Sequence, residues 1–326
     1  RDLTKKYQLD PHLSMIVDRY ATYTGSDPRK APAVLLTIAY VESTFGAWHI
    51  QGGVGQLSVA LEQRCIELGV NFKFNALVKE ILIENNKTIG IKTIDGVEIK
   101  SDLVVANSDA EYIYNQLISK NVSAARSERR KLKLATKSLS GFSLLLGLDN
   151  SKGKAVSIDH HNVYFPSNYD SEFDDIFTKQ IPVKDPTIYI CAPKDPLMTK
   201  GEDKEAWFVL VNAPRHQVDG GWDWRHGGAE YAQKIIQKLD HLGLNVSPRL
   251  DFMKYRTPAD LENYAMAPGG SIYGSSSNSP ISAFLRTKNR SKIKGLFCVG
   301  GSSHPGGGIP LVGISAEIVA NAIGKA

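Results

Sequence analysis

The sequence is poor in the features that mark several common classes of protein. Its 326 residues include three cysteines, Cys65, Cys191 and Cys298, which are odd in number and far apart. A disulfide framework needs an even set of cysteines in a small extracellular chain, so we predict buried thiols in a reducing compartment. The longest apolar run, residues 31–41, is shorter than the ~18–20 residues that span a bilayer, and the charged N-terminus lacks the apolar core of a signal peptide.

Several catalytic and binding motifs are also missing. No G-x-S-x-G, H-E-x-x-H or P-loop motif occurs, which argues against the hydrolase and nucleotide-hydrolysing classes that these motifs define. Basic residues are not interleaved with aromatic ones, so we expect no nucleic-acid partner. We also expect no metal. His160 and His161 are adjacent, adjacent strand residues face opposite sides, and no cysteine or third histidine stands at a ligand spacing.

The most informative absence is that of a nucleotide-binding fingerprint. The chain begins at Arg1 without a methionine, and nowhere does a predicted strand lead into a G-x-G-x-x-G helix start. In dinucleotide-binding proteins that fingerprint holds the pyrophosphate at a helix N-terminus. The residues alone therefore predict no complete dinucleotide site in this chain.

The composition that remains is ordinary for a globular protein with a sizeable core. It is 42% hydrophobic and 22% charged, and its length predicts one large or two medium domains. The net charge of +5 has two interpretations, a soluble surface or a weak preference for an anionic membrane surface. The basic run from Arg286 to Lys294 is interpreted as a solvated loop.

Hydrophobic periodicity predicts alternating helices and strands. Strands are expected at residues 70–74 and, fully buried, at 103–106, and Asp95-Gly96 predicts a hairpin with a type I′ turn. Further strands at 141–148, 163–165, 187–191 and 207–211 predict a separate mixed or antiparallel sheet. A helix with Ile235, Ile236 and Leu239 buried follows them.

The chain is organised around a stretch near its C-terminus. Residues 296–299 predict a buried strand, residues 300–313 form a loop rich in glycine, and apolar spacing predicts a helix from Ile314 to Ile323. Strand, glycine loop and helix is the layout that brings backbone N–H groups and a helix N-terminus to a ligand. On glycine content alone, a tight connection without a ligand is an equally good interpretation.

The order of residues in this loop is more specific than its glycine content. Val299-Gly300-Gly301, the run His304–Pro310 (HPGGGIP) and Ser315 resemble the C-terminal signature of the carotenoid (phytoene) desaturase family. The resemblance covers most of the chain, and its other matches are Arg19–Tyr23, Ser26-Asp27-Pro28, Ala31-Pro32-Ala33, Gly46-Ala47-Trp48, Gly52-Gly53, Thr257-Pro258 and Gly269–Gly274.

The resemblance implies an α/β (α+β) fold with an incomplete two-dinucleotide-binding FAD domain and a substrate domain. We expect residues 1–50 to form substrate-domain helices, 51–110 part of the FAD domain, 111–268 the substrate domain and 269–326 the C-terminal part of the FAD domain. Members of the family are longer at the N-terminus, where the missing fingerprint lies.

The resemblance also implies a set of FAD contacts. The residue that matches Val78 offers its backbone to the adenine, and the helix that follows the loop points its positive end at the flavin. The cofactor-binding residues implied in this way are Val78, Gly52, Gly53, Gly300, Gly301, Gly308, Ile309 and Pro310.

A long apolar substrate would need an apolar tunnel. Tyr40, Phe45 and Trp48 are assigned either to the core or to the wall of such a tunnel. His304 is assigned to the tunnel beside the flavin ring, or else only to the shape of the glycine loop. No acid–base residue can be named, and a hydrocarbon substrate needs little from side chains beyond removal of water.

The function implied is FAD-dependent desaturation of a carotenoid precursor such as phytoene, with hydride passing from an allylic C–H to flavin. We expect a peripheral protein at the cytoplasmic, inner face of the membrane, which draws its isoprenoid substrate from the bilayer. The alternatives are an enzyme on the same scaffold, similar to flavin amine oxidases or prenyl-lipid isomerases, and an inactive fragment that binds an isoprenoid.

Overall fold

The computed structural model describes residues 1–279, 282 and 286–325, and these residues form two compact units. Unit 1 comprises residues 1–39, 75–140 and 260–326, and unit 2 comprises residues 40–74 and 141–259. Three elements carry the chain from one unit into the other along the sequence: α3 (Thr37–Phe45), β5 (Ser140–Asp149) and α10 (Pro258–Ala265). None of the described helices has both the length and the apolar character needed to cross a membrane.

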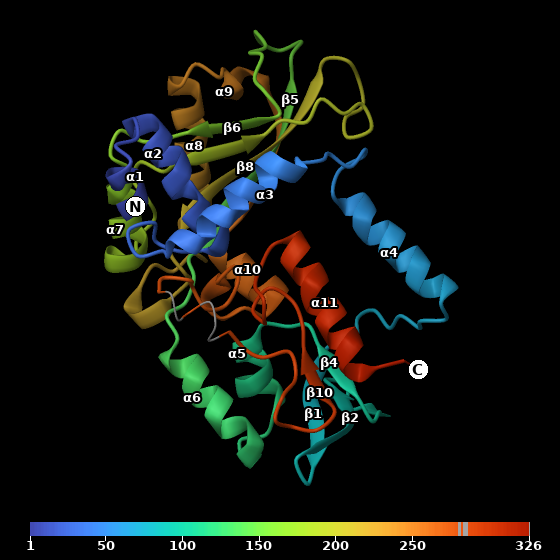
Figure 1. Cartoon of the computed structure of the whole chain (residues 1–326). Helices are drawn as coiled ribbons and strands as arrows, with labels where there is room; N and C mark the ends of the chain where they lie inside the picture. Colours follow the sequence, from blue (N-terminus) through green and yellow to red (C-terminus); the bar gives the residue numbers. More distant parts are fainter. Residues whose placement is uncertain (280–281, 283–285, 326) are drawn as a thin grey trace. The chain divides into compact units, whose positions relative to one another are not determined.

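Unit 1 contains two small sheets and the helices around them (Figure 1). Its elements are α1 (Asp2–Lys6), α2 (Pro11–Arg19), η1 (Tyr20–Thr24), η2 (Ala33–Leu36), β1 (Val78–Glu84), β2 (Lys87–Thr93), β3 (Glu98–Lys100), β4 (Val104–Ala106), α5 (Ala110–Tyr112), η3 (Ile113–Leu117), η4 (Ser123–Ala125), α6 (Arg126–Leu134), η7 (Pro268–Gly270), β10 (Leu296–Cys298) and α11 (Ile309–Ile323).

The strands of unit 1 bring distant parts of the chain together. β10 pairs in parallel with β4, so that Leu296 lies opposite Val104 and Cys298 opposite Ala106. β1, β2 and β3 form an antiparallel sheet in that order. The apolar core of the unit lies between these strands and the helices after β4, and its buried members include Ile81, Ile113, Leu117, Ile293, Leu296 and Cys298.

Unit 2 is built on a five-stranded sheet with the order β6-β7-β8-β5-β9. The pairs β6–β7, β7–β8 and β5–β9 are antiparallel, which agrees with the mixed or antiparallel sheet predicted from the sequence. Its elements are α4 (Gly55–Glu67), β6 (His161–Tyr164), α7 (Tyr169–Asp174), η5 (Asp175–Lys179), β7 (Ile188–Cys191), β8 (Lys204–Ala213), η6 (Val218–Gly220), α8 (Gly228–His241), α9 (Val246–Arg249) and β9 (Leu250–Arg256).

The core of unit 2 joins α8 to the sheet. The apolar face of α8 is buried at Ile235, Ile236 and Leu239, as the helical spacing predicts. Phe142 on β5 meets Tyr231 on α8 edge to face, with ring centroids 5.0 Å apart. Burying each of these large apolar side chains stabilises the fold by roughly 1.5–3 kcal/mol.

The sequence-based predictions of strands and turns need three corrections. Residues 70–74 do not form the predicted strand, and they pair with none of the described strands. The strand at 103–106 is found as β4, but Leu103 and Val105 are exposed because β4 has a single described neighbour and one uncovered face. The hairpin at Asp95-Gly96 is found, yet only Gly96 has positive φ there, so its turn is not type I′.

The two compact units divide the chain differently from the four segments expected from the resemblance. Residues 1–39 and 111–140, which we assigned to the substrate domain, pack in unit 1 with β10 and α11. Residues 51–74, which we assigned to the FAD domain, pack in unit 2. Packing units and functional domains are different divisions of a chain, so the domain assignment stays a prediction.

Candidate functional site

The segment from β10 to α11 has the predicted layout with one shift. α11 begins at Ile309, five residues before the predicted start, with Gly308 as its N-cap and Pro310 in the first turn. Proline is well tolerated there because the first N–H groups of a helix have no intrahelical partner and its fixed φ suits the helix. The positive end of the helix dipole therefore lies inside the HPGGGIP run itself.

The glycines of the loop between β10 and α11 are required for different reasons. A Cβ built on Gly307 would lie 1.9 Å from Cδ1 of Tyr273, so this position is glycine because an aromatic ring packs against it. Gly300 has a φ of +104° and faces the Asn107 side chain, where a Cβ would be 2.3 Å from Oδ1. Packing inside unit 1 thus accounts for both residues without a ligand.

Gly308 differs from them because it faces open space. Its φ is +96°, and no described atom lies within 4 Å of the place that a Cβ would take. Val312 N donates to Gly308 O over 3.0 Å, whereas for the N–H groups of Ile309 and Leu311 no acceptor occurs among the described residues. Free N–H groups at the positive end of a helix, beside an open glycine, suit an anionic or electron-rich ligand.

The loop is held at both ends by Asn289 and Ser315. The Nδ2 of Asn289 contacts the carbonyl oxygens of Cys298 and His304 at 3.1 and 2.9 Å, and Oγ of Ser315 at 2.9 Å. The N–H of Gly300 donates to the same Oγ over 3.3 Å. Ser315 was part of the family signature, but Asn289 carried no signal in the sequence. Together they fix the start of the loop against the helix that ends it.

Arg286 is a second supporting residue that the sequence analysis missed. We interpreted its basic run as solvated, yet Arg286 is only 4% exposed. Its guanidinium donates to the carbonyl oxygens of Tyr273 and Gly301, at 2.8 and 3.0 Å. Burial lowers the pKa of Arg286, while the Asp109 carboxylate raises it. Its neighbours in the run, Lys288, Arg290, Lys292 and Lys294, are exposed as predicted.

Asp109 gives this part of unit 1 a testable pH dependence. Its carboxylate accepts from the N–H of Glu111 over 2.8 Å, and burial raises the pKa of the carboxyl group. The folded state therefore holds this proton more tightly than the unfolded state. The stability contributed by Asp109 falls as the pH rises from the ordinary aspartate pKa of about 4 through the raised value.

We expect Asp109→Asn to remove this pH dependence, because asparagine keeps the helix cap but cannot ionise. In urea unfolding measured between pH 4 and pH 8, the stability of the variant relative to the wild-type protein should increase with pH. Asp102→Asn, at a side chain that is 95% exposed, is the control for the loss of one carboxylate. A constant difference between Asp109→Asn and the wild-type protein would contradict the expectation.

Val78 is the first residue of β1, which is an edge strand of its sheet. It is half-buried and lies opposite Thr93, and an irregularity in the register separates it from Glu80. An edge strand leaves backbone groups on one side without a strand partner. This placement is compatible with the role that the resemblance implies for Val78, which stays a prediction.

Gly52 and Gly53 lie in unit 2, where Asp195 organises the turn that contains them. The Oδ2 atom of Asp195 accepts from the N–H of Gly52 over 2.6 Å and contacts Nε2 of His49 at 2.8 Å. Hydrogen bonds from His49, Gly52 and Leu197 lower the pKa of this buried carboxyl group. The N–H of Gly52 is thus occupied by a carboxylate of its own unit, and the contact of this turn with a flavin stays a prediction.

The predicted tunnel residues are all exposed. Tyr40 and Phe45 on α3 are 64% and 67% exposed, Trp48 after it is 87% exposed, and His304 in the glycine loop is also exposed. The interpretation of Tyr40, Phe45 and Trp48 as core residues is therefore wrong. Their assignment to a substrate tunnel stays a prediction.

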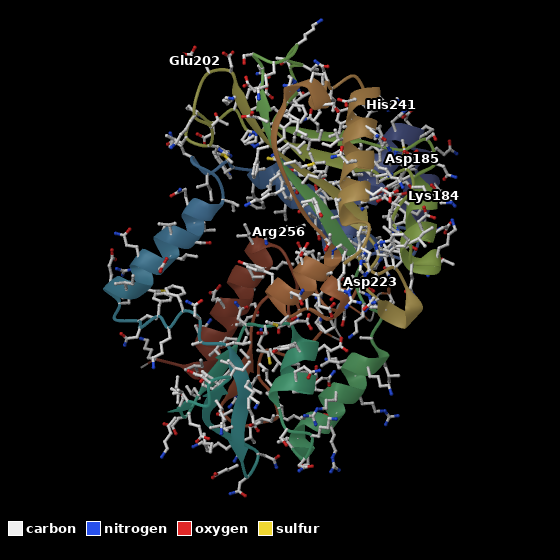
Figure 2. The ribbon with its side chains drawn as sticks, turned by 180° about the vertical axis from the view of Figure 1, so that it is seen from behind. Lys184, Asp185, Glu202, Asp223, His241 and Arg256 are labelled. Carbon is white, nitrogen blue, oxygen red and sulfur yellow. The ribbon has the colours of Figure 1, made fainter. Side chains whose placement is uncertain are left out.

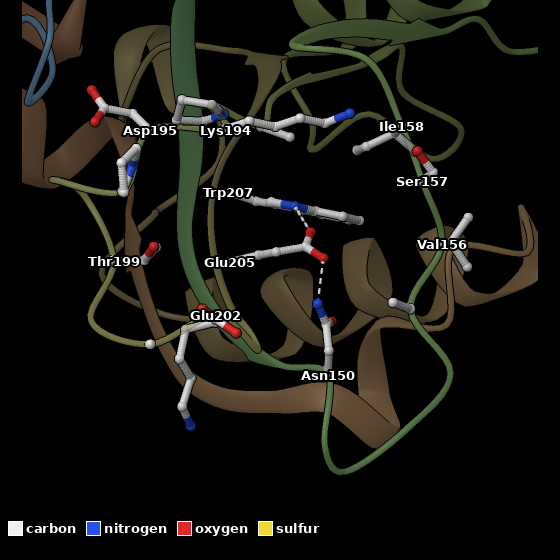
Figure 3. A pocket seen from close by; sticks show the side chains of 16 residues that line it. Asn150, Val156, Ser157, Ile158, Lys194, Asp195, Thr199, Glu202, Glu205 and Trp207 are labelled. Carbon is white, nitrogen blue, oxygen red and sulfur yellow. Dashed lines mark hydrogen bonds between the residues drawn. The ribbon is translucent and has the colours of Figure 1, made fainter.

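Unit 2 also contains a cavity of about 660 Å³, which the sequence analysis did not foresee (Figure 3). Glu205 lies in its wall, where its carboxylate accepts from Nε1 of Trp207 over 2.7 Å and from Nδ2 of Asn150 over 2.8 Å. Lys194, Asp195 and Glu202 add further charged groups to the lining. None of the predicted tunnel residues lines this cavity.

Comparison with known proteins finds relatives that are carotenoid desaturases. It is 34% identical over 322 residues to a 1-hydroxycarotenoid 3,4-desaturase of Flavobacterium sp. (strain P99-3), which covers 98% of this chain and 63% of that protein. It is 33% identical to a zeta-carotene-forming phytoene desaturase of Myxococcus xanthus, covering 98% of this chain and 60% of the relative. A hydroxyneurosporene desaturase of Rubrivivax gelatinosus is 30% identical, and the match covers 99% of this chain and 60% of that protein.

Over almost its whole length the chain is similar to members of the carotenoid desaturase family. No protein-family model matches it. Among solved structures, an oxidoreductase from Methanosarcina mazei shares the fold, with a TM-score of 0.65 and 16% sequence identity over 98% of this chain and 67% of that one. The fold class predicted from the sequence is thereby confirmed. The chain spans about three fifths of the length of the carotenoid desaturases that it matches.

Proposed function

We propose that the protein is an FAD-dependent carotenoid desaturase. The observation that carries the proposal is the open N-terminus of α11 at Gly308, which lies within the family signature. This arrangement fits the flavin end of FAD, because a flat ring system can approach a glycine without a Cβ and the helix dipole favours electron-rich groups. Bound FAD would supply the chemistry by accepting hydride from an allylic C–H of the substrate.

The chain's own residues would bind and orient the cofactor. Gly308, Ile309 and Pro310 would lie against the ring, with Gly300 and Gly301 nearby in the loop, and Val78 would offer its backbone to the adenine. Asn289 and Arg286 would act as positioning residues, because both are buried and hold the loop through hydrogen bonds. The free N–H groups of the first turn of α11 would stabilise negative charge that develops on the ring.

The flavin part of the proposal predicts that charge at the start of α11 controls binding. Ile309 and Ile314 are both exposed on this helix, so each can be replaced by glutamate without loss of a buried contact. Glutamate in the first turn interacts favourably with the helix dipole, so Ile309→Glu should fold normally. Its carboxylate would occupy the electropositive end of the helix, and we expect FAD binding to weaken at least about tenfold.

This expectation is checked by titrating the purified chain with FAD and following flavin fluorescence. Ile314→Glu is the matched control, since it places the same charge five residues further along the helix. We expect its FAD affinity to stay within about twofold of the wild-type value, because the dipole effect falls off beyond the first turn. Equal affinities of the two variants would contradict a flavin at Gly308.

The proposed substrate is a long acyclic carotenoid. Expression of the complete gene in bacteria that accumulate phytoene should yield a more conjugated, coloured polyene, and the absorbance maximum would give the number of new double bonds. Unchanged phytoene, with protein and flavin both present, would exclude phytoene. Because the chain is 34% identical to a 1-hydroxycarotenoid 3,4-desaturase, the second substrate to test in these bacteria is a 1-hydroxylated acyclic carotenoid.

Such a substrate resides in membranes, so we propose peripheral binding at the inner, cytoplasmic face and entry through a tunnel that involves Tyr40, Phe45 and Trp48. The high exposure of these three apolar residues supports this part of the proposal. Co-sedimentation with liposomes is the test. Absence of binding to both neutral and anionic vesicles would exclude the peripheral association.

A further inference from the structure

Three side chains with metal-binding atoms meet at one edge of the five-stranded sheet of unit 2. The imidazole nitrogens of His160 and His161 and the Sγ of Cys191 offer ligand atoms that all lie within 4.8 Å of one another. β6 is the outermost strand of this sheet and pairs with β7. In that pair His161 lies directly opposite Cys191. Directly opposite residues of an antiparallel pair project from the same face of the sheet. The thiol of Cys191 and the imidazole of His161 therefore lie side by side.

His160 joins them for a reason that a strand pattern does not reveal. Adjacent strand residues face opposite sides, which led us to expect no metal here, but β6 begins only at His161. His160 precedes the strand, and its ring centroid lies 4.5 Å from that of His161. Its carbonyl oxygen accepts from the N–H of Ala192, next to Cys191, over 2.8 Å, which anchors the backbone at this position.

A partner behind His161 orients its ring, whereas the ring of His160 has no such partner among the described residues. The hydroxyl of Tyr189 lies 2.8 Å from Nδ1 of His161, which leaves Nε2 of that ring for another partner. No hydrogen-bond partner for the ring nitrogens of His160 is found among the described residues, and this ring is half-buried. The ring nitrogens of His160 are therefore available as ligand atoms beside the second imidazole and the thiol.

A third imidazole lies beside the cluster. The ring of His49 lies 5.0 Å from that of His160, so three imidazoles gather at this edge. Asp195 holds His49 from behind through its carboxylate, at 2.8 Å.

We propose that His160, His161 and Cys191 form a zinc-binding site. Two imidazoles and one thiolate are the donor set that suits Zn²⁺ or another soft or borderline cation rather than Mg²⁺ or Ca²⁺. Three protein ligands leave the fourth position of a tetrahedral zinc to water. The ion would join the edge strand β6 to β7 next to the cavity of unit 2, whose lining includes Ile158 and Ala192. Binding of the thiolate would release the thiol proton.

The decisive experiment measures binding of Zn²⁺ alone to the metal-free chain, in competition with a chromophoric chelator. We expect one ion per chain, and we expect Cys191→Ser and His161→Ala each to weaken binding by more than about 100-fold, since each removes a ligand. Matched controls are Cys65→Ser, at a half-buried cysteine outside the cluster, and His241→Ala, at an exposed histidine in the last turn of α8 (Figure 2). Both controls should bind like the wild-type protein.

A second measurement needs no variant to fold. Co²⁺ bound to the wild-type chain should show a thiolate-to-cobalt charge-transfer band in the near ultraviolet together with the visible bands of a tetrahedral ion, and Zn²⁺ should displace it. A stoichiometry below one, or Co²⁺ bound without the thiolate band, would overturn the proposal. So would a thiolate band that disappears in Cys65→Ser and persists in Cys191→Ser.

Discussion

Gly307→Ala should destabilise the protein by about 3 kcal/mol, which is large for the addition of one methyl group. The new Cβ would lie 1.9 Å from the ring of Tyr273, and atoms of both the loop and the ring would have to move. Backbone strain is not the cause, because Gly307 is not among the glycines with positive φ. Urea unfolding monitored by far-ultraviolet circular dichroism, which reports the helices and strands of both units, would measure the change.

Two further variants identify the cause of that loss. Gly313→Ala makes the same chemical change within α11, where no described atom lies within 4 Å of the new Cβ, and should stabilise the protein by about 0.5–1 kcal/mol. In a Tyr273→Ala background, Gly307→Ala should cost at least about 2 kcal/mol less than it does alone. If the two substitutions proved additive, the ring would not be the reason for glycine at this position.

Arg286→Met should also cost about 3 kcal/mol of stability. Methionine fills much of the same volume, but the carbonyl oxygens of Tyr273 and Gly301 would lose their buried donor. Asp109, also buried, would lose the positive charge that lies near it. Because Gly301 lies in the glycine loop, we also expect FAD affinity to fall in the variant under conditions where it remains folded.

Arg290→Met is the matched control for this prediction, since it removes an arginine from the same basic run at an exposed position. Its effect on urea unfolding should be within about 0.5 kcal/mol of zero. The stability lost in Arg286→Lys should lie between the losses in Arg286→Met and Arg290→Met. Lysine keeps the charge but lacks the planar guanidinium that reaches both carbonyl groups. Similar losses for Arg286→Met and Arg290→Met would refute a special role for Arg286.

The sequence predicted best those features that depend on neighbours along the chain. The order of strand, glycine loop and helix was found, as was the apolar face of α8 at Ile235, Ile236 and Leu239. The start of α11 was placed too late because apolar spacing begins at Ile314, while the first turn consists of residues that also suit a loop. A turn with positive φ at both central residues does exist, at Asn85-Asn86 between β1 and β2.

The features that the sequence could not predict depend on partners far away in the chain. Arg286 is indistinguishable from Arg290 by its neighbours, and only the carbonyl groups of Tyr273 and Gly301 make it a buried residue. In the same way, Cys191 meets His161 only because β6 and β7 pair in one particular register. Strand register is set by the whole sheet, so no local spacing rule could have brought these side chains together.

The division of the chain into two interleaved units has a consequence for the order of folding. Unit 2 ends at residue 259, so all of its segments have left the ribosome while residues 260–326 are still being synthesised. Unit 1 cannot form its pairing of β4 with β10 until that last segment appears, almost two hundred residues after β4. The apolar strand β4 therefore stays unpaired until β10 has been synthesised. We expect unit 1 to fold more slowly than unit 2 and to be more prone to aggregation during translation.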